Sequence, residues 1–173
     1  METYENLMFQ PVCEEDVAGL TEIMTRAFDT DTKQFLGCEK GGPEGYDTGE
    51  FIRRWALHSP THSYKVVLDD KVIGAVIVWI NESNENVLGC IFIDPLLENR
   101  GIGLTIWRYI EQKYPDTKKW MTETPGYSKR NHHFYVNKCG FKIVKIQNPM
   151  SREDVCYILE KECSSRAATV WGS

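Results

Sequence analysis

The chain has 173 residues, of which 42% are hydrophobic and 26% charged, an ordinary composition for one soluble globular domain. Its net charge is -5 at pH 7, and its basic residues form no long cluster, which disfavours a nucleic-acid-binding protein. No apolar run approaches the roughly 20 residues that span a bilayer. The acidic N-terminus carries no secretory signal pattern. These features predict a cytoplasmic protein that does not enter a membrane.

The cysteines are scattered and form no Cys-x-x-Cys pair, which disfavours both a zinc site and a disulfide framework. We therefore expect free thiols, several of them packed in strands as small apolar groups, and no bound metal. The six positions are Cys13, Cys38, Cys90, Cys139, Cys156 and Cys163.

The first third of the chain predicts one strand and two helices. Residues 9–12 are typical of a short strand. Three acidic residues then precede apolar residues at helical spacing, and this helix is expected to stop near residues 28–31. Residues 37–49 contain five glycines and a proline and predict a loop. Residues 50–58 predict a second, shorter helix.

Most predicted strands follow this loop. Residues 64–68 and 72–80 are rich in β-branched residues and flank a tight hairpin turn. Residues 87–93 form a third apolar run. A helix over residues 103–114 joins this run to a strand at 120–124, so these two strands are expected to be parallel neighbours.

The end of the chain predicts a capped helix and a strand pair. Ser128 is expected to cap a helix that runs to residue 138, and strands follow at 141–146 and 155–160. The whole order predicts a single α/β domain over residues 1–163, with a mixed, mostly antiparallel sheet of six to seven strands and helices on both faces. Residues 164–173 have no clear period and predict a tail that is mobile or docks through Val170 and Trp171.

A glycine-containing segment lies where the strand at 87–93 leads into a helix. Unpaired N–H groups at a helix start, together with the helix dipole, bind anions, and glycine lets a phosphate approach the backbone. The dinucleotide pattern is excluded because Ile106 stands where it needs glycine, and the Walker pattern lacks its Gly-Lys-Ser/Thr. On these residues alone, a glycine-rich turn without a ligand stays an open alternative. The segment is Glu98-Asn99-Arg100-Gly101-Ile102-Gly103.

This segment, preceded by Ile91-Phe92-Ile93-Asp94-Pro95, resembles the acetyl-CoA signature of the GNAT superfamily, the GCN5-related N-acetyltransferases. The signature is a strand, a proline, and then Arg/Gln-x-x-Gly-x-Gly/Ala opening a helix. Glu98 replaces the Arg or Gln, which is tolerable because backbone N–H groups bind most of the phosphate, provided that the acid turns away. The resemblance implies these cofactor-binding residues: Ile91, Phe92, Ile93, Glu98, Asn99, Arg100, Gly101, Ile102, Gly103, Leu104 and Thr105.

A second segment, Asn131 to Tyr135 followed by Gly140-Phe141, is similar to the Asn-x-x-x-Tyr…Gly-Phe helix of the same family. The resemblance implies that Asn131 contacts the pantetheine arm and that Tyr135 is the general acid toward the departing thiolate. One residue more than usual separates the tyrosine from the glycine, so counting back from Gly140 would select Val136. We favour Tyr135 because its spacing to Asn131 is intact, with the extra residue absorbed by a π-bulge or a loosened last turn.

The resemblance also implies a mechanism. Acetyl-CoA would lie in a V-shaped gap where the strands at 87–93 and 120–124 diverge, paired with the backbone of Ile91 and Ile93. The N–H near Ile93 would polarise the thioester carbonyl. An amine would attack directly, and Glu123, near the end of the splayed strand, is the first candidate for the base. The adjacent histidines at 132 and 133 are read as surface or packing residues.

The acceptor is the least determined part of this prediction. Asp29 and Asp31 fall in the expected loop that family members use to cover the acceptor, which makes them candidates for attracting a cationic substrate. The resemblance implies a small-molecule or peptide amine as acceptor and frequent homodimers. A non-catalytic acyl-CoA-binding sensor is the alternative, because Glu98 and the shifted Tyr135 depart from the family pattern.

Overall fold

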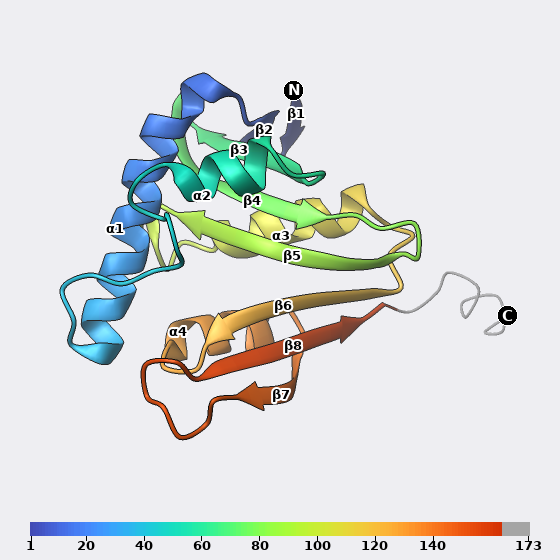
Figure 1. Ribbon diagram of the computed structural model, residues 1–173. Helices are drawn as coiled ribbons and strands as arrows, with labels where there is room; N and C mark the ends of the chain where they lie inside the picture. The colour runs from blue at the N-terminus through green and yellow to red at the C-terminus, as the bar shows by residue number, and fades with distance from the viewer. Residues whose placement is uncertain (164–173) are drawn as a thin grey trace, which may run out of the picture.

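The computed structural model describes residues 1–163, so the predictions for residues 164–173 lie outside it. The described chain forms one eight-stranded sheet in the order β1-β2-β3-β4-β5-β6-β8-β7. Helices α1 and α2 lie on one face of the sheet, and α3 and α4 lie on the other (Figure 1). The strands are β1 (Glu2–Tyr4), β2 (Leu7–Pro11), β3 (His62–Leu68), β4 (Lys71–Trp79), β5 (Glu85–Ile93), β6 (Lys119–Pro125), β7 (Lys142–Gln147) and β8 (Cys156–Glu162).

The predicted fold class is confirmed: all pairs in the sheet are antiparallel except β5 with β6. The strand number is a correction, because Glu2–Tyr4 pairs with β2 and adds an eighth strand. The helical segments are η1 (Glu14–Asp16), α1 (Val17–Leu36), α2 (Glu50–Ile52), η2 (Arg53–Leu57), η3 (Pro95–Leu97), α3 (Ile102–Lys113), α4 (Lys129–His132) and η4 (His133–Lys138).

The central strand β4 contributes to a hydrophobic core on each face of the sheet. Val76 and Val78 pack with the α3 side, whereas Ala75 and Ile77 pack with the α1 and α2 side. This alternation is the period of a strand, and a strand covered on both faces is apolar throughout. The two cores hold the sheet rigidly where β5 leads into the glycine segment.

Helix α1 does not end near residues 28–31, as the sequence predicted, but continues to Leu36. Asp and Thr favour turns and caps because their side chains compete for backbone groups. Here the carboxylates have tertiary partners instead: Asp29 accepts hydrogen bonds from the Tyr46 hydroxyl at 2.5 Å and the Gly41 N–H at 3.1 Å. The helix ends at Gly37, whose φ of 74° lies in the left-handed region. Asp29 and Asp31 are therefore helical residues.

Strands β5 and β6 pair in parallel, as predicted, but only where Glu85–Val87 faces Lys119–Met121. Beyond this point β5 stays paired with β4 and β6 with β8, so the two strands diverge. A register shift sets Cys90 opposite Ile77 but Leu88 opposite Val78, which makes Gly89 a β-bulge. The sheet is thus split along β5, which can be followed in Figure 1 as the gap between the green and orange strands.

Three further features bear on the function classes. Over residues 1–163, no helix has both the length and the apolar character that a membrane crossing requires. All six cysteines lie in this range and are free thiols. The same residues contain no group of three or more His, Cys, Asp or Glu side chains arranged to hold a metal ion.

Candidate functional site

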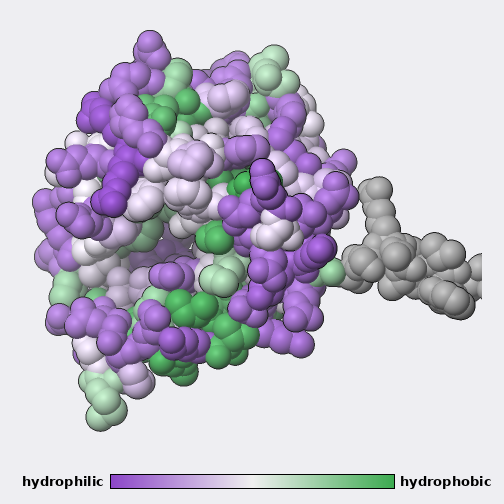
Figure 2. Space-filling model, turned by 45° about the vertical axis from the view of Figure 1, so that its right-hand side comes forward, coloured by the Kyte–Doolittle hydropathy of each residue, from purple (hydrophilic) through white to green (hydrophobic). Residues whose placement is uncertain are grey.

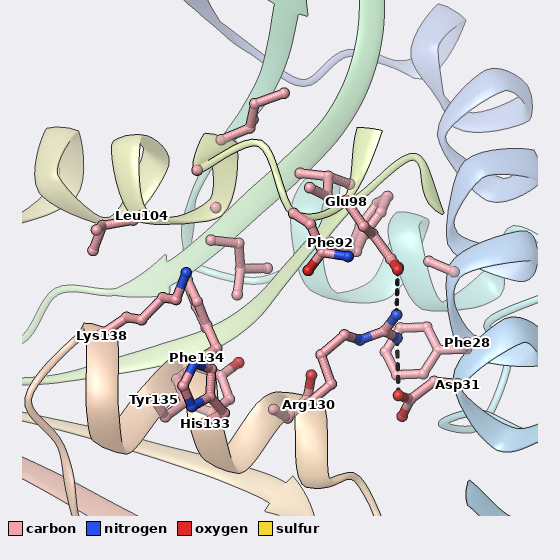
Figure 3. Close-up of a pocket in the computed structure, with 18 residues that line it drawn as sticks. Phe28, Asp31, Phe92, Glu98, Leu104, Arg130, His133, Phe134, Tyr135 and Lys138 are labelled. Carbon is pink, nitrogen blue, oxygen red and sulfur yellow. Dashed lines mark hydrogen bonds and ion pairs between the residues drawn. The ribbon is translucent and has the colours of Figure 1, made fainter. Parts of the chain in front are cut away.

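A cavity of about 250 Å³ lies between the glycine segment, the end of β5 and helix α4 (Figure 3). It brings together most of the residues that the sequence singled out for cofactor binding. Those that line it are Ile91, Phe92, Ile93, Glu98, Asn99, Gly101, Ile102, Gly103, Leu104, Asn131 and Tyr135. Arg100 is exposed and does not line the cavity, and neither does Thr105, whose hydroxyl donates to the Gly101 carbonyl at 3.1 Å.

The start of α3 presents bare backbone to this cavity. Gly101 is the N-cap, with a φ of 77°, and no side chain caps the helix. The N–H groups of Ile102, Gly103 and Leu104 lie in the first turn, where no helical carbonyl is in reach. A side chain at Gly103 would place its Cβ 3.1 Å from the Phe134 ring, so glycine allows the start of α3 and segment η4 to approach closely. This donor set suits a phosphate group.

The backbone at the end of β5 also faces the opening. The Asp94 N–H donates to the Ile73 carbonyl on β4 at 2.7 Å. Because backbone groups along a strand point alternately to either side, those of Ile93 and Ile91 point away from β4, toward the gap. No β6 residue pairs with them. An extended chain with amide groups can therefore pair with this strand edge.

Helix α4 places Asn131 at the cavity wall. Ser128 caps the helix, as predicted, and its hydroxyl accepts the Asn131 N–H at 3.3 Å. The Asn131 side-chain amide donates to the Thr124 hydroxyl at 3.1 Å, which ties α4 to the end of β6. The side chain is thereby oriented at the mouth of the split.

Tyr135 lies one turn further along and is buried, with 7% of its surface exposed. Burial raises its pKa above the ordinary value, and the nearby thiols of Cys90 and Cys139 add to this effect, while a hydrogen bond with Thr122 opposes it. The phenol therefore holds its proton at neutral pH. Tyr135 lines the cavity and Val136 does not, which agrees with the choice made from the Asn131 spacing.

A π-helix accommodates the extra residue before Gly140. Of the two predicted alternatives, a π-bulge and a loosened last turn, the first is confirmed. Segment η4 covers His133–Lys138, and the Cys139 N–H donates to the Phe134 carbonyl, five residues back, at 2.9 Å. Gly140 follows with a φ of 86°. The π-helix begins after Asn131, and Asn131 and Tyr135 both line the cavity.

An arginine that sequence reasoning missed lies at the centre of the site. Arg130 bridges two acids: its Nη1 is 2.5 Å from Glu98 Oε2, and its Nη2 is 2.8 Å from Asp31 Oδ1 (Figure 3). Ser128 also donates to Asp31 Oδ1 at 3.1 Å. Burial raises the pKa of Asp31, against the opposing effect of Arg130. This Glu98–Arg130–Asp31 cluster connects α1, the glycine segment and α4. The one signal for it in the sequence was the unusual acid at position 98.

A second cavity, of about 410 Å³, adjoins the split from the α2 side of the sheet. Glu123 lines it, together with Gly89 and Cys90 of the bulged strand and aromatic residues from η2 and β4. The Glu123 side chain is exposed and lies 3.8 Å from the Cys156 thiol. In the space-filling view the surface is hollowed between the upper and lower halves of the molecule, at the height of the β5–β6 gap (Figure 2).

The remaining candidates lie outside this second cavity. Asp29 holds the loop through Tyr46 and Gly41, and Asp31 lines the first cavity within the arginine cluster. His132 stacks on Tyr157 with ring centroids 4.4 Å apart, as a packing residue would. His133 is exposed and lines the first cavity.

Comparison with known proteins matches this chain to a family over most of its length. Residues 20–141 match the model of the Acetyltransferase (GNAT) family. YrkN from Bacillus subtilis (strain 168) is 46% identical over 86 residues, which are 49% of this chain and 46% of YrkN. The chain thus aligns with about half the length of that curated relative.

Two solved structures have a similar fold. PaiA N-acetyltransferase from Thermoplasma acidophilum, in complex with coenzyme A, has a TM-score of 0.71 at 16% identity, covering 91% of this chain and 99% of its own. Ribosomal-protein-S18-alanine N-acetyltransferase from Escherichia coli has a TM-score of 0.69 at 15% identity, covering 92% and 95%. At identities this low, the two structures show a similar fold and nothing more. The family model, by contrast, matches well over half of the chain. The protein therefore belongs to the GNAT acetyltransferase family.

Proposed function

We propose that this protein is an N-acetyltransferase that moves an acetyl group from acetyl-CoA to a primary amine of a small molecule or peptide by direct attack. The observation that carries the proposal is the first cavity, where an uncapped helix start, a free strand edge and the Tyr135 hydroxyl meet. Family membership makes acetyl-CoA the acyl donor.

The residues present fit acetyl-CoA, which when bound supplies an acyl group activated as a thioester. The N–H groups of Ile102, Gly103 and Leu104 would hold the diphosphate. The free backbone edge at Ile91 and Ile93 would pair with the pantetheine amides, and the Ile93 N–H would stabilise negative charge on the carbonyl oxygen. Asn131 would contact the same arm.

Tyr135 is the proposed general acid. Its raised pKa keeps the phenol protonated at neutral pH, which suits a group that gives up its proton to a leaving thiolate. It lines the first cavity together with Ile91, Phe92 and Ile93 at the end of β5. Such a proton donor lowers the barrier without any covalent enzyme intermediate.

Glu123 is the proposed general base. It lies on β6 and lines the second cavity, on the opposite side of the split sheet from the glycine segment. An exposed carboxylate takes a proton from an ammonium group through water once the two are within hydrogen-bonding reach. The proposal therefore assigns the acid to one cavity and the base to the other.

The proposal is tested by measuring CoA release from acetyl-CoA with a panel of primary amines. Tyr135→Phe is expected to slow turnover by roughly 10²–10⁴-fold, the range for a lost general acid, with little change in CoA affinity. Tyr109→Phe is the matched control, because Tyr109 is also a buried tyrosine of raised pKa but does not line the cavity. Unchanged turnover in Tyr135→Phe would remove the proposed acid.

A second candidate function is a non-catalytic acyl-CoA sensor, and the observation in its favour is Glu98 in the phosphate-binding segment. An acid there lowers the affinity for a diphosphate unless it is neutralised. Tight CoA binding without turnover of any amine in the panel would favour the sensor over the enzyme.

A further inference from the structure

The second cavity has an aromatic wall, made of Phe51, Trp55 and Trp79. Trp55 and Trp79 meet edge to face, with ring centroids 6.1 Å apart and planes at 68°. Phe51 and Trp55 are 6.5 Å apart at 60°. All three side chains are only partly buried, so part of each ring is left for a ligand. Stacked or edge-to-face contact with such a wall favours an aromatic ring in the ligand.

The charged groups of this cavity are few. Two exposed acids, Glu44 and Glu123, line it together with one cation, Arg54. The Arg54 guanidinium lies over the Trp55 ring, 4.5 Å from its centroid, and forms no ion pair with any described residue. Two carboxylates and one guanidinium give this cavity one excess negative charge. The balance suits an acceptor with a single ammonium group and offers little to a polyamine.

One segment of β5 joins this cavity to the first. Val87 to Cys90 line the second cavity, and Ile91 to Ile93 line the first. Cys90 and Ile91 are neighbours along β5, and Tyr135 lines the first cavity together with Ile91. The two cavities therefore adjoin consecutive segments of one strand, and the proposed acid lines the first of them.

We infer that the acceptor is a small arylalkylamine: a single primary amine on a short chain that carries an aromatic ring. The ring would pack against Trp55 and Trp79, and the amino group would face Glu123. The cavity volume of about 410 Å³ lies in the range of sites for such molecules, roughly 300–1,000 Å³. This inference rests on the proposed function and names its acceptor class.

The test compares the arylalkylamine with acceptors that lack the ring, carry several amines or add a carboxylate. With 2-phenylethylamine, kcat/KM is expected to exceed that for spermidine, phenylalanine and ethylamine by at least about tenfold. Trp79→Ala should reduce this preference by about tenfold or more, whereas Trp79→Phe keeps a ring and should retain most of it. Val144→Ala, an exposed residue of β7, is the control and should change nothing.

A binding measurement separates this inference from the proposed function. Calorimetric titration of 2-phenylethylamine into the CoA-saturated protein is expected to show binding that Trp79→Ala weakens about tenfold, while the melting temperature of the variant reports on its folding. If no amine turns over but this binding is found, the arylalkylamine site stands as a ligand site and the enzyme proposal fails. If spermidine or phenylalanine is acetylated as efficiently as 2-phenylethylamine, or Trp79→Ala leaves the preference intact, the inference is overturned and the enzyme proposal stands.

Discussion

Arg130 is expected to make coenzyme A binding possible beside the acid at position 98. Its guanidinium is 2.5 Å from Glu98 and 2.8 Å from Asp31, and all three side chains line the first cavity. Replacing Arg130 by Gln removes the positive charge and leaves two carboxylates near the start of α3. We predict that this variant binds coenzyme A much more weakly.

The size of the effect follows from Coulomb's law. A carboxylate and a phosphate charge roughly 6 to 8 Å apart repel each other by about 2 to 3 kcal/mol at an effective dielectric constant of about 20. Salt screens part of this repulsion because Glu98 is partly exposed to solvent. Since each 1.4 kcal/mol is a factor of about ten, the expected loss of affinity is about tenfold to a hundredfold.

Glu98→Gln serves as the complementary variant. On its own it should bind coenzyme A a few times more tightly than the unaltered protein, because Arg130 then has one acid fewer to neutralise. The double variant with Gln at positions 98 and 130 should recover most of the affinity lost in Arg130→Gln. This recovery is the non-additivity expected when two residues act through each other.

The assay is calorimetric titration of coenzyme A at two salt concentrations, with S-acetylpantetheine as a ligand that lacks the phosphates. Affinity for S-acetylpantetheine should be unaffected by all three variants. Arg26→Gln is the matched control, because Arg26 also pairs with a carboxylate, Asp94 at 3.1 Å, at the same end of β5 but does not line the cavity. A double variant as weak as Arg130→Gln would refute the reasoning, because Arg130 would then bind the phosphates directly.

Three further predictions concern the tyrosines and the π-helix. Because burial raises the pKa of Tyr135, the acid should stay protonated and kcat should not fall between pH 8 and about pH 10; a decline centred near pH 8 would contradict this. Burial, with Asp29, raises the pKa of Tyr46 to about 12, so its stabilising effect is present below about pH 10 and lost as pH rises through 12. Tyr46→Phe should therefore lower the free energy of unfolding by about 1 kcal/mol at pH 8, measured in urea, and equal stability would be the contrary result. Deleting Asn137, which follows Tyr135 in the π-helix, should preserve turnover. Deleting His133 shifts Tyr135 relative to Asn131 and should slow turnover about 100-fold. Equal turnover in the two deletion variants would contradict the assigned spacing of Asn131 and Tyr135.

The parts of the site that depend on local backbone could be predicted from the sequence. Ser128 as a cap, Gly101 at a helix start and Gly140 after a helix each follow from a conformation or a hydrogen bond within a few residues. The extra residue before Gly140 also shows in simple counting, so a π-bulge was predictable. Because much of the first cavity is built from such short segments, the resemblance to the GNAT motifs anticipated many of its lining residues, although not Arg130.

What the sequence could not reveal depends on contacts between distant segments. Helix α1 runs past Asp29 and Asp31 because Tyr46 and Arg130 satisfy their carboxylates, and no local pattern contains those partners. The aromatic wall of the second cavity likewise forms only when η2 packs over β4. The cavity proposed for the acceptor was therefore the part that the sequence left open.

Glu98 illustrates why a departure from a motif has to be judged in three dimensions. Along the chain it is an acid in a phosphate-binding segment, which argues against binding. In the fold it faces Arg130, the residue directly before Asn131, in the first turn of α4. The same helical turn thus positions Asn131, the proposed pantetheine contact, and pairs Glu98 with Arg130. The positions of Asn131 and Arg130 both depend on how α4 starts. Loss of the Ser128 cap should therefore weaken cofactor binding in two ways, by displacing Asn131 and by leaving Glu98 without its arginine partner.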